Sequence, residues 1–157
     1  MLNQATDNFK QIDSLSCAEY YNQYYAYSQF INKSGIDTLS KVDAENLQVF
    51  YASGNTIKEY LKMRYTTLEK VKLINTQLVN LMRDLKSGAI KSDDAISFIN
   101  NENQAARACI SNLKTNTNVI QQGIDNFNKT LVSTELFIKK NNQDNLPAIT
   151  KQNIYTN

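Results

Sequence analysis

The sequence predicts an all-α protein, an elongated antiparallel three-helix bundle, and two runs of regularly spaced apolar residues are the main reason. The runs span residues 47–85 and 96–138, and in each of them apolar side chains recur alternately three and four residues apart. This spacing keeps one stripe of a helix against a partner helix, as in a coiled coil. A single proline and four glycines leave few breaks in such helices.

The first helix is expected from about Thr6 to Asn32, with its end at Ser34-Gly35. Tyrosines and aliphatic residues give it an apolar face in three-four spacing. The connector that follows, residues 36–42, is apolar at three positions. Three side chains are alternative N-caps for the next helix: Asp37, Ser40 and Asp43.

The second helix is expected from about Asp43 to Lys86. Gly54 falls on its apolar stripe, where glycine either permits a close helix contact or breaks the helix. We expect a continuous or kinked helix. A short fourth helix is the alternative if Gly54 breaks the second one.

The turn after this helix has the clearest local signals in the sequence. Arg83 and Lys86 place positive charge at a helix C-terminus, and Gly88 suits the left-handed position just beyond it. Ser92 is the expected cap of the third helix, whose apolar register continues to Ile138.

Residues 1–140 are expected to form one helical-bundle domain, and residues 141–157 an extended or disordered C-terminal tail. Apolar residues make up 41% of the chain, so intrinsic disorder of the body is excluded. The chain also contains 21 Asn and 11 Gln residues, and Asn forms helices poorly. Its helices must therefore be stabilised by packing against one another.

The charge is small overall and unevenly distributed. A net charge of +2 does not indicate nucleic acid as a partner. Residues 1–54 carry three basic and six acidic side chains, whereas residues 55–91 carry eight basic and three acidic ones. Either the acidic segment packs beside the basic helix, or the basic helix offers a face to an anionic partner.

No apolar run reaches the length of about 20 residues that a membrane span needs. The first residues, Met1 to Gln4, do not resemble a signal peptide, and a mature secreted protein with an added Met would look the same.

The chain contains no histidine, which removes most catalytic and metal-binding arrangements. Ser-His-Asp and Cys-His sites, histidine-ligated zinc and the Glu-x-x-His pairs of di-iron bundles are all excluded. The four glycines lie far apart, so no phosphate-binding loop is present. We expect no enzyme activity, no cofactor and no metal.

Cys17 and Cys109 are a candidate disulfide pair. If the two long helices form a hairpin about Gly88, Cys109 lies level with residues 64–70, and the first helix can reach that height. A disulfide would fit an oxidising compartment. The alternative is two reduced, buried thiols in a cytosolic protein.

Five tyrosines within eight residues form a candidate partner-binding face. They cover about 160° of a helix, which is more than one core stripe needs. Either Tyr20, Tyr24 and Tyr27 are core while Tyr21 and Tyr25 seal its edge, or exposed rings dock a partner. On the second interpretation, Tyr21 and Tyr25 are at least partly exposed.

These features favour a non-enzymatic interaction or structural module, a bacterial periplasmic or secreted protein that binds a protein partner through a helix face. A cytosolic adaptor or export chaperone is one alternative. A small-ligand binder that uses the tyrosine face is another. The sequence indicates neither the partner nor the oligomeric state, and a helical bundle alone carries no function.

Overall fold

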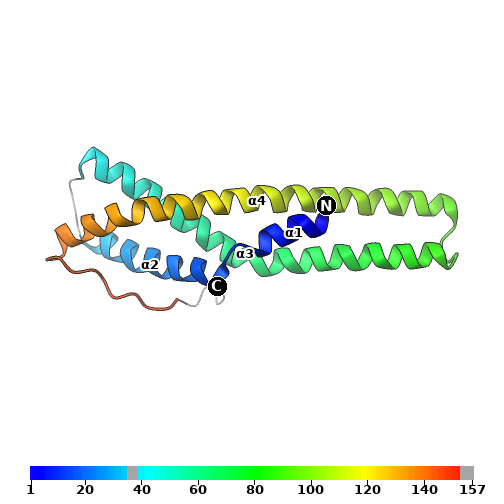
Figure 1. Cartoon of the computed structure of the whole chain (residues 1–157), viewed down its shortest axis with the longest axis horizontal. Helices are drawn as coiled ribbons and strands as arrows, with labels where there is room; N and C mark the ends of the chain where they lie inside the picture. Colours follow the sequence, from blue (N-terminus) through cyan, green and yellow to red (C-terminus); the bar gives the residue numbers. More distant parts are fainter. Residues whose placement is uncertain (35–38, 153–157) are drawn as a thin grey trace. The chain divides into compact units, whose positions relative to one another are not determined.

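The structure is a computed structural model of the chain, and it describes residues 1–34 and 39–152, apart from the side chains of residues 92 and 93. All regular structure in these residues is helical, which confirms the all-α prediction. The four helices (Figure 1) are α1 (Leu2–Lys10), α2 (Ser14–Lys33), α3 (Lys41–Lys86) and α4 (Ser92–Asn141).

The chain divides into two compact units. Unit 1 consists of Met1–Ile12 and Met63–Thr117, and it therefore holds α1, the second part of α3 and the first part of α4. Unit 2 consists of the described residues of 13–62 and 118–157, and it holds α2 with the remaining parts of α3 and α4. Three helical segments thus pack together within each unit.

The predicted first helix is interrupted, so the described residues form four helices where three were expected. Asp13 has an extended backbone (φ −68°, ψ 103°), and its carboxylate accepts hydrogen bonds from the N–H groups of Leu15 and Ser16 at 2.9 and 3.3 Å. The Ser16 hydroxyl donates a further bond, which together with these N–H groups lowers the pKa of Asp13. Asp13 is therefore the N-cap of α2.

The extra helix boundary lies at Asp13 and not at Gly54, since α3 continues through Gly54 as we expected. A Cβ atom at Gly54 would collide with the ring of Tyr24. The glycine therefore allows α2 to approach α3 closely. The Ser40 hydroxyl accepts a hydrogen bond from the Asp43 N–H at 3.1 Å, which identifies Ser40 as the cap of α3.

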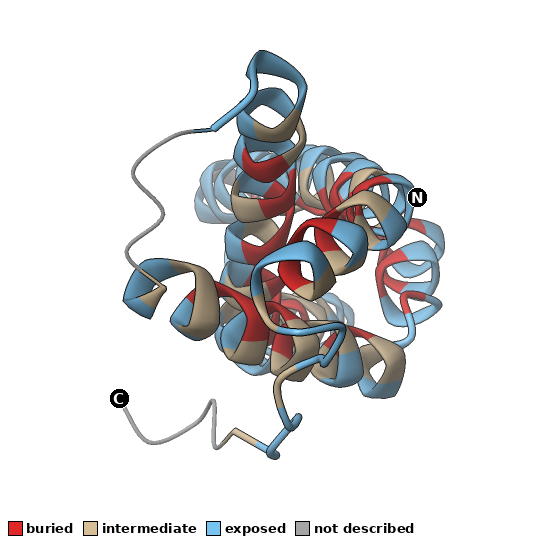
Figure 2. Cartoon of the chain, turned by 90° about the vertical axis from the view of Figure 1, so that its left-hand side faces the viewer, coloured by how far each residue is buried: buried red, intermediate tan, exposed pale blue. Residues whose placement is uncertain are grey.

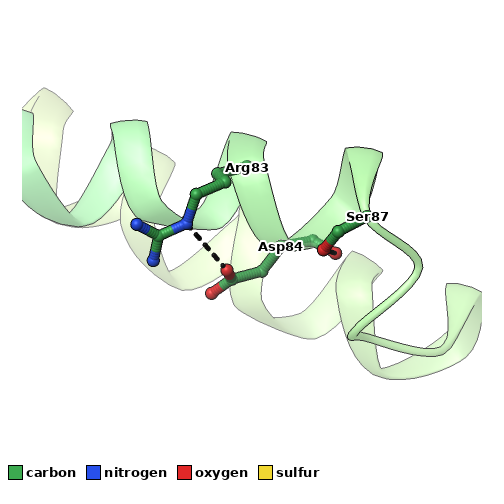
Figure 3. Close-up of polar contacts among 3 residues, drawn as sticks. All are labelled: Arg83, Asp84 and Ser87. Atoms are coloured by element: carbon green, nitrogen blue, oxygen red, sulfur yellow. Dashed lines mark hydrogen bonds and ion pairs between the residues drawn. The ribbon is translucent and has the colours of Figure 1, made fainter.

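The turn between α3 and α4 has the predicted form. Gly88 adopts a φ of 70°, its N–H donates to the carbonyl of Leu85, and the Ala89 N–H donates to the carbonyl of Asp84. These two bonds define a Schellman motif. Figure 3 shows the last turn of α3, where the Arg83 guanidinium lies 3.3 Å from the Asp84 carboxylate.

α4 begins at Ser92 as predicted. α2 ends at Lys33 with Ser34 as its C-cap, which agrees with the end expected at Ser34-Gly35. The part expected of Gly35 in this end, and the capping role expected of the Ser92 side chain, lie outside the described residues.

Burial differs between the two units. In Figure 2 the buried positions lie on the sides of the helices that face one another. The stripes of α3 and α4 are buried in unit 2, at Phe50, Ile57, Phe127 and Ile138 among others. Within the hairpin of unit 1, residues 72–112, Ala95 is the buried residue among those whose side chains are described.

The chain leaves α4 after Asn141, and residues 145–152 form neither helix nor strand. The backbone N–H of Gln152 donates to the Asn22 side-chain oxygen of α2 at 2.9 Å, which attaches this segment to unit 2. The single-domain division at residue 140 and the elongated form stay predictions.

Substitution of Gly88 tests the turn. No atom lies within 4 Å of a Cβ built at Gly88, so the cost of Gly88→Val comes from its left-handed backbone alone. We expect a loss of more than about 1 kcal/mol in the free energy of unfolding, measured by urea denaturation. Ser87→Ala is the control, because its exposed bond to the Asp84 carbonyl should contribute less than about 0.5 kcal/mol. Equal effects of the two substitutions would contradict this account of the turn.

Candidate interaction surfaces

The tyrosines of α2 belong mainly to the core of unit 2. The Tyr20 ring centroid lies 5.4 Å from that of Phe127, the Tyr24 centroid 5.7 Å from that of Phe50, and Tyr27 stacks on Phe50 at 6.4 Å. Such distances are typical of packed aromatic pairs. These contacts join α2 to both long helices within unit 2.

The tyrosine hydroxyls are also used inside unit 2. Tyr24 donates a hydrogen bond to the Asn55 side-chain oxygen at 3.0 Å, and Tyr27 donates to the Glu135 carboxylate at 2.9 Å. Burial raises the pKa of Tyr27, and the hydrogen bond and negative charge of Glu135 raise it further. These hydroxyls therefore hold the helices together and are not available to a ligand.

The expectation that Tyr21 is exposed is wrong. Tyr21 is only 8% exposed, because its ring lies against those of Tyr24 and Tyr25 at 6.1 and 6.4 Å. Burial also raises the pKa of the Tyr21 hydroxyl. Tyr25 is 37% exposed, as expected for a residue at the edge of the cluster.

The disulfide expected between Cys17 and Cys109 is absent from the structure. Cys17 is buried on α2 in unit 2, whereas Cys109 is half-buried on α4 in unit 1. Burial raises the pKa of the Cys109 thiol, and the nearby charge of Lys70 partly offsets that rise. Cys109 and Lys70 line one pocket of about 490 Å³, which agrees with the hairpin register expected from the sequence.

The hairpin of unit 1 exposes large apolar side chains. Some of them, including Met82, Ile96 and Ile99, occupy the predicted stripes, and others flank the stripes. The exposed apolar residues of α3 and α4 in unit 1 are Tyr65, Leu73, Val79, Met82, Ile96, Phe98 and Ile99. Val79, Leu73 and Phe98 were not among the candidate residues predicted from the sequence. Val79 could have been found from its place directly beside the stripe residue Leu78.

Two adjacent grooves run along α3 in unit 1. The first, of about 750 Å³, lies between α1 and α3 and ends at Val79. The second, of about 570 Å³, is lined by Val79, Met82, Arg83, Lys86 and Ser87, and we call it the tip groove. Both grooves are lined by Val79, so they adjoin at this residue of α3.

The charged side chains of the tip groove are both basic. Arg83 forms an ion pair with Asp84, which lines a different pocket together with Phe98. Lys86 is exposed and forms no ion pair within the described residues. The tip groove is therefore lined by two apolar side chains, Val79 and Met82, together with two cations.

The pH dependence of stability tests the role of Tyr27. The folded protein holds Tyr27 neutral, so its stabilising effect is fully present below the ordinary tyrosine pKa of about 10. That effect is lost above this pH, by up to about 1.4 kcal/mol per pH unit for each such tyrosine. We expect Tyr27→Phe to cost about 1 kcal/mol at pH 7, and to show a shallower loss of stability between pH 9 and 11 in urea denaturation. An unchanged slope would argue against the buried bond to Glu135.

The described helices include none that is both long and apolar enough to cross a membrane. Among the described side chains, no three Cys, Asp or Glu groups gather as metal ligands would. Comparison of the chain with protein-family models, curated proteins and solved structures finds no match to any of them.

Proposed function

We propose that this chain is a non-enzymatic interaction module that binds a protein partner through the hairpin of unit 1. One observation supports this proposal most strongly: Met82 and Ile96, which belong to the apolar stripes, are 57% and 62% exposed. Stripe positions ordinarily face a neighbouring helix. Their exposure on the hairpin indicates a place where a further helix can pack.

Exposed apolar residues in unit 2 have a different pattern. Val132 and Leu136 are as exposed as the hairpin residues, but the predicted stripe of α4 consists here of Leu131, Thr134 and Ile138 and does not include them. Isolated apolar side chains on a surface are ordinary, whereas a contiguous apolar patch is typical of an interaction site. The hairpin is therefore the better candidate surface.

The tyrosine face supports a binding role less well. Four of its five rings are buried or half-buried within unit 2, and two of its hydroxyls bond to neighbouring helices. A small ligand at these rings would have to displace core contacts. We therefore place the proposed binding surface on unit 1.

A periplasmic or secreted location stays part of this proposal as an expectation from the sequence, and the unbonded Cys17 and Cys109 do not support it. A cytosolic adaptor or export chaperone that uses the same hairpin is the alternative. The lack of histidine supports a non-enzymatic role in either location.

Site-specific photo-crosslinking tests the proposal. A benzoylphenylalanine residue is placed at Met82 or Ile96, and in matched controls at Val132 or Leu136, which are 64% and 63% exposed. In native extract we expect a protein adduct of one defined mass from the two hairpin positions and none from the controls. An excess of the unlabelled chain should abolish the adduct. Adducts from the controls, or from no position, would contradict the proposal.

A further inference from the structure

We propose that the tip groove binds an amphipathic helix of the partner protein that carries acidic side chains beside its apolar face. This inference rests on the proposed function, and it adds the chemistry of the partner. It depends on the space along α3, on the apolar residues that surround that space, and on the charges at its edge.

α1 is the third helix of unit 1 along only part of α3. It has nine residues and is about 13 Å long, whereas the 24 residues of α3 in unit 1 extend over about 36 Å. Figure 1 shows α1 away from the turn that joins α3 and α4. The tip groove begins at Val79, and the eight residues from Val79 to Lys86 span about 12 Å, the length of about two turns of a docking helix.

The neighbouring helix α4 also carries exposed apolar side chains along the hairpin. Phe98 lines a different pocket together with Leu81 and Asp84, on the opposite side of the hairpin from the tip groove. At 100° per residue, Ile99 lies about 100° and Ile96 about 160° from Phe98 around the helix. Both isoleucines therefore point away from the pocket that Phe98 lines. A helix laid in the groove would contact apolar residues of both α3 and α4.

The charges at the edge select an acidic partner. Arg83 and Lys86 both line the tip groove, and no carboxylate lines it among the described residues. The guanidinium of Arg83 has donors besides the Nε group that meets Asp84, and the Lys86 ammonium is exposed. Glutamates that flank the apolar face of a docking helix would meet both cations. Such pairs favour one partner and one orientation over others.

A second copy of this chain fits the groove less well. In a two-fold symmetric interface the same patch meets itself, so basic edges would face basic edges across it. A membrane surface also fits less well, because the basic residues line a concave groove and Asp84 lies beside Arg83.

Two synthetic peptides test the inference by fluorescence anisotropy on the full chain. Each is a 15-residue helix with leucines in three-four spacing, flanked by glutamates in one peptide and by lysines in the other. We expect the acidic peptide to bind at least ten-fold more tightly than the basic one. Met82→Asp should weaken the binding of the acidic peptide at least ten-fold.

Charge reversal provides the decisive comparison. In the double variant Arg83→Glu, Lys86→Glu we expect the preference to switch to the basic peptide. The matched control is Lys129→Glu, Lys140→Glu, which changes the net charge equally at exposed positions of unit 2 and should keep the preference for the acidic peptide. Circular dichroism checks that each variant is folded.

Several results would overturn the inference. Equal binding of the two peptides, or a preference that survives the charge reversal, would show that the charges do not select the partner. A dimer in sedimentation equilibrium that Met82→Asp dissociates, without peptide binding, would identify a second copy as the occupant. Binding to phosphatidylglycerol vesicles but to neither peptide would identify a lipid surface. If neither peptide binds while crosslinking from Met82 persists, this inference is wrong and the proposed function stands.

Discussion

The contacts of Phe50 connect all three helical segments of unit 2. Its ring lies 5.3 Å from that of Phe127 on α4 and within 6.4 Å of the Tyr24 and Tyr27 rings on α2. Gly54, one turn further along α3, provides the space for Tyr24. Removing a core aromatic side chain typically costs about 3–5 kcal/mol, so the stability of unit 2 depends strongly on Phe50.

Fewer of the described residues are buried in unit 1 than in unit 2. The buried residues of unit 1 lie mainly on α1 and at Val71 and Leu113, while the hairpin toward Gly88 consists of two helices with exposed apolar flanks. Two paired helices bury only the narrow side of each helix that faces the other. The residues beside that contact therefore remain exposed to water. The tip groove forms for the same reason, because the side chains that line it are not packed against a third helix of unit 1. Low local burial and a candidate binding surface thus have one physical cause.

The sequence predicted the parts of the fold that depend on local spacing. The two long helices follow from apolar periodicity, and the turn at Gly88 follows from the need for a left-handed residue after Lys86. The break at Asp13 was missed because Phe9, Ile12 and Cys17 appeared to continue one apolar face. Ile12 and Cys17 are five positions apart, which departs from three-four spacing, and Asp13 and Ser16 between them are in capping positions; this was the signal for the break.

The surface could not be predicted in the same way. Whether a stripe residue such as Met82 is buried depends on how far α1 extends along α3. No local sequence pattern predicts that extent. Tyr21 is buried because its neighbours Tyr24 and Tyr25 pack around it, and this also depends on the tertiary contacts of α2.

Hydrogen exchange measured by mass spectrometry tests the central claim, that the core of unit 2 is well covered and the end of the hairpin is not. Amides in residues 47–61 and 120–138 should exchange only through global unfolding, whereas those in residues 76–86 and 94–104 should exchange at least a hundred-fold faster, at a rate set by local opening. Equal protection of the two sets of amides would contradict the account.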